Sequence, residues 1–310
     1  MKLSQKIGAT VVALATTIGL AACSDSGSTT ASTASSEVAT SARTADAALT
    51  VKDAAGRTIE FAEMPDRIVL AEGRAAYATA LLQENPLDNI VAYGQDLVKN
   101  AGAFRDKLLE LQPEAKDLPA IGMIQKGDVT VENLLAQDPD VVIMTLDQKK
   151  AAEEAGMIAD MDAAGITYAY IDFRQKPLEN TTVSMQLLGD LLGQSERAAK
   201  YNEFYDAKVK EISERAAKIA EKPDVLLWTA AGYNECCAIA GNVHLGTLVT
   251  AAGGHNLGPE VLGPESKTIT PEKMIELDPE KIIVTGGEWA RDPNTVSYTH
   301  LRAHETKANL

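Results

Sequence analysis

A stretch in the middle of the chain, residues 195–220, has the periodicity of one long amphipathic helix. Its apolar residues recur every three or four positions, which places them on one helix face. Ser195 offers a side-chain oxygen for the N-cap. At about 1.5 Å of rise per residue the helix extends over about 40 Å, long enough to connect two compact units. The apolar stripe consists of Ala198, Tyr201, Tyr205, Val209, Ile212, Ala216 and Ile219.

The segments on either side of this helix repeat one pattern. Residues 129–145 and 269–285 match at a constant offset (278 − 138 = 140) without a gap. Each copy predicts a Thr N-cap, a short helix, an Asp-Pro stop and a buried β-branched strand. We therefore expect two α/β lobes, although such units can also recur by chance in an α/β protein. The matched pairs are Thr130/Thr270, Glu132/Glu272, Asp138/Asp278, Pro139/Pro279, Ile143/Ile283 and Thr145/Thr285.

Strand and helix patterns alternate through both halves of the chain, which is typical of mainly parallel sheets. A hairpin is expected over 49–61, and a helix over 246–252 is stopped by the two glycines that follow it. The expected strands are 68–70, 90–92, 141–144, 168–171, 225–228 and 282–284. The predicted domains are an N-terminal α/β lobe (49–177), a helical linker (178–222) and a C-terminal α/β lobe (223–295) that we expect to be truncated.

The N-terminus has the pattern of an export signal, expected over residues 1–22. Two lysines precede an apolar run that ends in Leu20-Ala21-Ala22-Cys23. This ending resembles the bacterial lipoprotein cleavage box, which implies that Cys23 is lipidated and anchors the protein outside the cytoplasm. Ordinary signal cleavage beside an incidental cysteine is the alternative. Residues 23–48, rich in Ser, Thr and Ala, predict a disordered tether.

Composition excludes several classes of function. The net charge of −15 disfavours binding to a phosphate backbone, so no nucleic-acid partner is expected. No dinucleotide, Walker, nucleophile-elbow or zinc-protease motif occurs.

Adjacent Cα atoms lie about 3.8 Å apart across a trans peptide, below the usual disulfide range, so Cys236 and Cys237 are expected to be two buried thiols. The tail 296–310 resembles a translated sequencing adapter and is expected to be non-native.

Several short motifs, in order along the chain, resemble the iron-siderophore and cobalamin periplasmic-binding family. They are Asp53-Ala-Ala-Gly56-Arg57, Pro65-Asp-Arg67, the Asp-Pro strands of the repeat, and Gly253-Gly254-His-Asn256. The resemblance covers about 49–290. It implies two Rossmann-like lobes bridged by a single long helix, a ligand cleft between them, and delivery to an ABC permease and its ATPase. Tyr77 and Thr247 occupy the places where many members have permease-docking glutamates, so the resemblance implies no docking residues here.

In open α/β sheets the ligand lies beyond the carboxyl ends of the strands, and this rule selects the first-lobe candidates. Arg74 offers a planar fork of donors to an anionic iron chelate, or is a solvated arginine in the first turn of a helix. Arg174 offers a second cation, or forms a surface salt bridge. Tyr93 stacks on or hydrogen-bonds a ligand, or belongs to the core.

The second lobe contributes three further ligand-binding candidates. Trp228 and Tyr233 follow its first strand, where aromatic side chains suit a cleft. His244 reaches either the cleft or a metal, or is structural. No metal site and no resident cofactor are predicted.

The leading interpretation is a monomeric, lipid-anchored substrate-binding protein, not an enzyme, that captures a ferric siderophore for import. Within the family, cobalamin, heme and a metal oxyanion such as molybdate are alternatives. From another class, a two-lobed enzyme related to chelatases or nitrogenases remains open, as does a solute sensor for a membrane receptor. The exported N-terminus argues against the enzyme, because such enzymes usually need cytoplasmic reductant or nucleotide.

Overall fold

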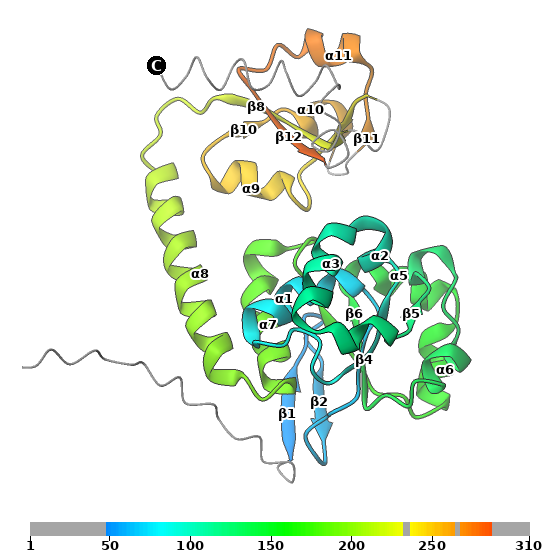
Figure 1. The fold of residues 1–310 in the computed structure, drawn as a ribbon. Helices are drawn as coiled ribbons and strands as arrows, with labels where there is room; N and C mark the ends of the chain where they lie inside the picture. Colours follow the sequence, from blue (N-terminus) through cyan, green and yellow to red (C-terminus); the bar gives the residue numbers. More distant parts are fainter. Residues whose placement is uncertain (1–47, 232–235, 264–266, 287–310) are drawn as a thin grey trace, which may run out of the picture. The chain divides into compact units, whose positions relative to one another are not determined.

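The computed structural model describes residues 48–231, 236–263 and 267–286. They form a β-hairpin and two separate five-stranded sheets, which two consecutive helices connect along the chain (Figure 1). Within these ranges, no helix combines the length and the apolar character that crossing a membrane requires. The expected organisation of two α/β units linked by a long helix is therefore confirmed for the described chain.

The N-terminal sheet is entirely parallel, with strand order β5-β4-β3-β6-β7. Its central strand β3 is buried along its whole length, and separate apolar clusters cover the two faces of the sheet. This explains why β3 and β6 consist almost entirely of apolar residues. The strands are β3 (Ile68–Leu70), β4 (Ile90–Gly94), β5 (Ala120–Ile121), β6 (Val141–Thr145) and β7 (Tyr168–Ile171).

Short helices connect these strands. The α-helices are α1 (Ala76–Leu82), α2 (Asp96–Asn100), α3 (Gly102–Leu111), α4 (Val131–Leu135), α5 (Leu146–Glu154) and α6 (Met157–Ala163). Single turns of 3-10 helix are η1 (Gly73–Ala75), η2 (Pro113–Asp117) and η3 (Ile124–Lys126). Because η1 and α5 begin within three residues of the ends of β3 and β6, polar residues of the first helical turns come to the same edge of the sheet.

The connecting helices are α7 (Pro177–Leu191) and α8 (Ser195–Ala216). The expectation that Ser195 caps α8 is wrong, because the cap position is Gln194 and Ser195 is already helical. The backbone N–H of Gln194 donates to the carbonyl of Gly189 in the last turn of α7, at 2.6 Å, and so brings the chain into α8 one residue early. Of the apolar stripe of α8, Ala198 is buried, and most of the other side chains are half-buried or exposed.

The C-terminal sheet is mixed. Its long strand β8 pairs in parallel with β10 and β12 and antiparallel with β9, which pairs with β11. The strands are β8 (Asp224–Ala231), β9 (Ala238–Ile239), β10 (His255–Asn256), β11 (Lys267–Thr268) and β12 (Lys281–Gly286). The helices are α9 (Gly246–Ala251), α10 (Gly258–Leu262) and α11 (Pro271–Glu276). The expected stop after α9 is confirmed, since Gly253 has a φ of 89°.

The internal repeat is confirmed in its backbone. Thr130 and Thr270 both cap their helices by accepting a backbone N–H, at 3.3 and 3.2 Å. Asp138 and Asp278 both have left-handed φ angles, 48° and 45°, at the Asp-Pro stop. The expectation of a buried strand holds only for the first copy.

The second copy of that strand, β12, is exposed over much of its length. Ile282 and Ile283 are 45% and 47% exposed, whereas every residue of β6 is buried. The physical difference lies in pairing: β6 is flanked by β3 and β7, while β12 pairs with β8 alone among the described strands.

The hairpin of β1 (Leu49–Lys52) and β2 (Thr58–Phe61) is fastened to the sheet by its turn. The buried Asp53 carboxylate accepts the backbone N–H groups of Arg57 and Tyr170, and it also accepts the Arg57 guanidinium at 2.8 and 2.9 Å. That guanidinium also donates to the Tyr168 carbonyl, at 2.8 Å, and stacks over the Tyr168 and Tyr170 rings. The motif around Asp53 is thus a structural fastening onto β7.

A second motif fastens the loop before β3. The Arg67 guanidinium donates to the carbonyls of Gln137 and Asp138, both at 2.6 Å. In return, Asp140 accepts the backbone N–H groups of Asp66 and Arg67, both at 2.9 Å. The Asp-Pro stop before β6 and the entry to β3 therefore lock each other in register.

We expect Asp53→Ala to lower the free energy of unfolding by about 2 to 4 kcal/mol, because it removes the buried acceptor of several donors. Arg57 is partly exposed and can rehydrate, which keeps the loss below that for a fully buried pair. Urea denaturation measures it. Asp66→Ala, an exposed carboxylate in the neighbouring loop, is the control and should stay within about 0.5 kcal/mol of wild type. Equal losses in the two variants would contradict the assigned fastening.

Candidate functional site

The strand order of the N-terminal sheet creates one switch point, between β3 and β6. From β3 the chain first builds outward through β4 and β5, and it then returns to the other side of β3 to add β6 and β7. The connections that leave β3 and β6 therefore diverge, which opens a crevice at the carboxyl ends of these two strands. This is the place where open parallel sheets bind ligands.

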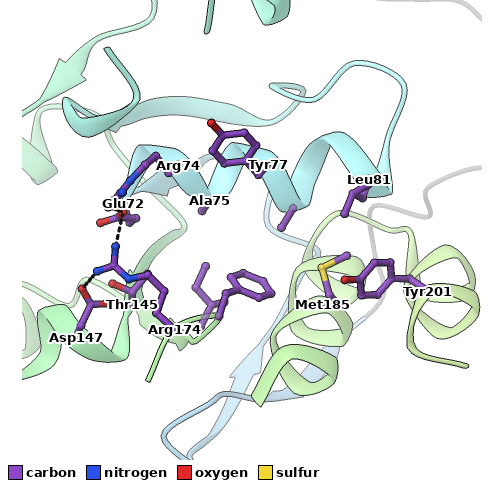
Figure 2. Close-up of a pocket in the computed structure, with 13 residues that line it drawn as sticks. Glu72, Arg74, Ala75, Tyr77, Leu81, Thr145, Asp147, Arg174, Met185 and Tyr201 are labelled. Carbon is purple, nitrogen blue, oxygen red and sulfur yellow. Dashed lines mark hydrogen bonds and ion pairs between the residues drawn. The ribbon is translucent and has the colours of Figure 1, made fainter. Parts of the chain in front are cut away.

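A cavity of about 310 Å³ lies at this switch point. Figure 2 shows that its charged side chains gather at one end, that Leu81, Met185 and Tyr201 lie at the other, and that Tyr77 lies between them on α1. The volume is at the lower end of the range of about 300 to 1,000 Å³ for small-molecule sites. The lining residues are Glu72, Arg74, Ala75, Tyr77, Ala78, Leu81, Thr145, Asp147, Ile171, Phe173, Arg174, Met185 and Tyr201.

Arg74 comes from η1, directly after β3, and is held by two carboxylates. Its Nε donates to Asp96 Oδ2 at 3.0 Å, and its terminal nitrogen forms a short ion pair with Glu72. Burial lowers the pKa of Arg74, but the charges of Glu72 and Asp96 outweigh burial and raise it overall. The guanidinium is therefore a fixed cation, about one third exposed toward the cavity.

Arg174 approaches from the segment after β7 and meets the same carboxylate. Its NH1 lies 3.8 Å from Glu72 Oε1, while its NH2 forms a short ion pair with Asp147 of α5. Figure 2 shows these contacts as one chain of charges across the end of the cavity. The structure thus brings together Arg74 and Arg174, which are 100 positions apart in the sequence (174 − 74 = 100).

The turn that carries Arg174 is built on a buried aspartate. Asp172 accepts the backbone N–H groups of Arg174, Gln175 and Lys176 and the side-chain amide of Asn180, at 2.7 to 2.9 Å. These donors satisfy its carboxylate away from water and fix the chain between β7 and α7. The direction of the Arg174 side chain therefore follows from a rigid turn.

Glu72 is the central anion of the charged end. Burial, followed by the nearby charge of Asp96, raises its pKa, and Arg74 and Arg174 only partly offset this. Its side chain is 8% exposed. With all groups ionised, the two arginines face three carboxylates, Glu72, Asp96 and Asp147 (2 − 3 = −1). The site is thus not a preformed anion hole, because its cations already have counter-ions.

Two oxygens on the cavity wall have no hydrogen-bond partner among the described residues. They are Thr145 Oγ1, at the end of β6, and Asp147 Oδ1. Thr145 is 8% exposed. Buried polar atoms without partners usually bind water or a ligand. A ligand here is therefore expected to present hydrogen-bonding groups beside its charged edge.

The opposite end of the cavity is apolar. Tyr77 of α1 stacks on Phe104 of α3, with ring centroids 4.0 Å apart, and Tyr201 brings a second aromatic ring from α8. Met185 of α7 adds a flexible apolar side chain between helices. Sequence reasoning missed this wall, although Tyr201 was recognised in the stripe of α8. A charged end and an apolar end together suit an amphipathic ligand.

The remaining predicted site residues lie elsewhere. Tyr93 is 1% exposed, and its hydroxyl accepts a hydrogen bond from Arg105 at 3.1 Å, so the structure places it in the core and not on the cavity. Trp228, on β8, is half-buried, and His244, before α9, is exposed and has a left-handed φ of 53°; neither lines the cavity. Tyr233 and Cys23 lie outside the described residues.

The expectation of two buried thiols is contradicted. The structure joins Cys236 and Cys237 by a disulfide across a cis peptide bond, with the Cα atoms 3.0 Å apart. The expectation had assumed a trans peptide between them. Cys237 is fully buried, whereas Cys236 is exposed. Among the described residues, no group of three or more His, Cys, Asp or Glu is arranged to hold a metal ion.

The last family motif also has a structural role. The Asn256 amide donates to the carbonyls of Ala240 and Gly241, and its oxygen accepts the backbone N–H of Gly258 at 3.1 Å. A Cβ at Gly258 would lie 1.8 Å from the Ala240 carbonyl oxygen, so only glycine fits. The motif holds the loop after β9 against β10.

Comparison with known proteins adds independent evidence. A family model described as "Periplasmic binding protein" matches residues 96–310, which is more than two thirds of the chain. No curated protein matches. The crystal structure of a TroA-like periplasmic binding protein, FepB from Veillonella parvula, is similar with a TM-score of 0.69 and 28% identity, over 79% of this chain and 71% of that one.

Two further structures share the fold. The molybdate-bound periplasmic binding protein MolA of a Haemophilus influenzae ABC transporter has a TM-score of 0.60 and 19% identity, over 76% of this chain and 73% of that one. The periplasmic heme-binding protein RhuT from Roseiflexus has a TM-score of 0.51 and 23% identity, over 70% and 75%. The expected two-lobed α/β fold class is confirmed by these likenesses.

These structures differ in the ligand that their names mention, but all are periplasmic binding proteins. Proteins of this class carry no resident cofactor and bind the ligand that is transported. The chain belongs to the periplasmic binding protein family, whose members bind small ligands and work with an ABC permease and its ATPase.

Proposed function

We propose that this protein is the lipid-anchored substrate-binding protein of an ABC importer and that it captures an anionic iron complex, in the first place a ferric siderophore. Cys23 is the proposed site of lipidation, and the protein acts as a monomer outside the cytoplasm. The single observation that supports an anionic ligand is the pair of arginines, Arg74 and Arg174, at the switch-point cavity. The motifs that resemble the iron-siderophore and cobalamin periplasmic-binding family support an iron complex as the cargo.

The geometry explains how such a ligand is held. Guanidinium groups from two elements present planar donor forks to carboxylate or catecholate oxygens, which gives both charge and direction. The unpartnered hydroxyl of Thr145 adds a donor beside them. A cavity of about 310 Å³ takes one edge of a chelate, and the rest of the ligand extends out of it.

Heme is the second candidate, and the apolar end of the cavity favours it. Heme combines a flat apolar body with two carboxylates at one edge, which matches a cavity lined by the aromatic side chains of Tyr77 and Tyr201 as well as by two arginines. Cobalamin and a metal oxyanion remain alternatives without a specific observation in their favour. A chelatase-like or nitrogenase-like enzyme has no catalytic constellation in the sequence to support it.

We expect Arg74→Ala and Arg174→Ala each to weaken an anionic ferric tris-catecholate by about 10- to 150-fold, because one charge-assisted hydrogen bond contributes about 1.5 to 3 kcal/mol. A neutral ferric tris-hydroxamate should lose much less. Isothermal calorimetry on the full-length, untagged protein measures the affinities.

The control for these two variants is Lys107→Ala, which removes an exposed lysine that pairs with Glu110 on α3. Urea denaturation confirms that each variant is folded at the temperature of the titration. Equal losses for the charged and the neutral complex would remove the assigned role of the arginines. A wild-type protein that binds neither complex in calorimetry would contradict capture of a ferric siderophore.

The heme candidate has its own test at the apolar end. We expect Tyr77→Ser to weaken heme binding by at least about fivefold, because it removes an aromatic contact that contributes about 1 kcal/mol or more to the binding free energy. It should leave a compact anion such as molybdate unchanged. Heme absorbance titration measures the first effect and calorimetry the second. Phe204→Ser, an aromatic on α8 that is 61% exposed and does not line the cavity, is the control; a similar loss there would argue against heme.

A further inference from the structure

One carboxylate at the cavity is shared by both arginines. Glu72 Oε1 accepts from Arg74 and lies 3.8 Å from the NH1 of Arg174, so a single oxygen sits between the two guanidinium groups. An incoming carboxylate or catecholate oxygen that contacts both arginines has to take this position. Glu72 is thus an internal competitor of an anionic ligand.

The other two carboxylates of the cluster are held differently. Asp96 accepts the backbone N–H groups of Gly73 and Arg74 at 2.8 and 2.9 Å, in addition to the Arg74 Nε, and its side chain is 2% exposed. These donors fix its charge in place. Asp147 pairs with the outer nitrogen of Arg174 and is more exposed. Among the described residues, only Arg74 donates a hydrogen bond to the Glu72 carboxylate.

The charges that face Glu72 come from four elements. Arg74 lies on η1, Asp96 on α2, and Arg174 in the segment after β7. Asp147, on α5, forms an ion pair with Arg174. Burial together with Asp96 already raises the pKa of Glu72 in the free protein. A second anion placed between the arginines would disfavour its ionised form further, because a nearby like charge raises the pKa of a carboxylate.

We propose that Glu72 is a specificity-determining residue: its carboxylate holds the place of the ligand's anionic edge between Arg74 and Arg174, and it takes up one proton from solvent when that edge binds. The proton converts the carboxylate to the neutral acid, so the charge brought by the ligand is partly compensated. This inference rests on the proposed function for the nature of the cargo, but it requires only that an anion occupies the cavity. Ligands without an anionic edge leave Glu72 in place.

The sign of the pH dependence follows from this exchange. At low pH, Glu72 is already protonated and the arginines are available, so affinity is highest. As pH rises through the pKa of Glu72 in the free protein, the ionised carboxylate competes, and the affinity falls by at most about tenfold per pH unit for one linked proton. A neutral ligand that does not displace Glu72 shows no such dependence.

The test is isothermal calorimetry of the full-length protein with three anionic probes: ferric tris-catecholate, citrate and molybdate. Each titration is repeated in two buffers of different ionisation enthalpy, which gives the number of protons taken up. We expect about one proton for wild type in the pH range where affinity falls, and none for Glu72→Gln. At about pH 8, Glu72→Gln should bind the probes about fivefold to tenfold more tightly than wild type.

Glu110→Gln, an exposed carboxylate of α3 paired with Lys107, is the matched control and should behave as wild type. If Glu72→Gln folds poorly, the number of protons that the wild type takes up on binding is by itself the test of the inference. Zero proton uptake, equal pH profiles for wild type and Glu72→Gln, or no binding of any probe by either protein would overturn the inference. Binding of citrate or molybdate with proton uptake, but not of the iron complex, would support it while contradicting iron capture.

Discussion

The reversal of strand order at β3 is the constraint on which the rest of the N-terminal unit depends. A parallel sheet must leave each strand through a crossover, and here the crossovers on the two sides of β3 run in opposite directions. The polar ends of β3 and β6 are therefore left uncovered at one edge, while both faces of the sheet are sealed by apolar clusters. The cavity, its arginines and its carboxylates all follow from that single opening.

The short motifs by which the family was first recognised turn out to hold the framework together. Asp53 and Arg57 fasten the hairpin onto β7, Arg67 ties the entry of β3 to the exit before β6, and Asn256 holds a loop of the second sheet. Each pairs a polar side chain with backbone groups of another segment. They identify the fold well for this reason, but they do not touch the cavity and say nothing about its ligand.

Charge balance decides what the cavity can do. Two arginines alone would make a simple anion site, but three carboxylates share their donors, and one of these is buried between them. The raised pKa of Glu72 reflects the cost of that arrangement. A site of this kind favours a ligand whose anionic group can replace the Glu72 carboxylate between the arginines. Its aromatic side chains also favour a ligand with an apolar part that packs against them.

Periodicity and capping in the sequence determined the elements. The Thr caps, the Asp-Pro stops, the strand positions and the long helix of the linker are local properties, written in residues a few positions apart, and the structure confirms them. The same reasoning placed Arg74 and Arg174 at strand ends, hence at the ligand edge. The same reasoning also selected Tyr93, which lies at a strand end but is buried in the core. Its burial depends on side chains of α3 such as Arg105, which a local sequence pattern does not place.

Only the tertiary structure decided which distant side chains meet. Glu72 was not recognised from the sequence, since nothing local distinguishes it from a solvated glutamate, and the apolar wall draws on helices that the sequence does not order in space. The exposure of β12 likewise depends on its neighbours, not on its apolar composition. Local interactions fix elements through short-range geometry, whereas the charge and burial of a site are sums over elements that come together only when the chain folds.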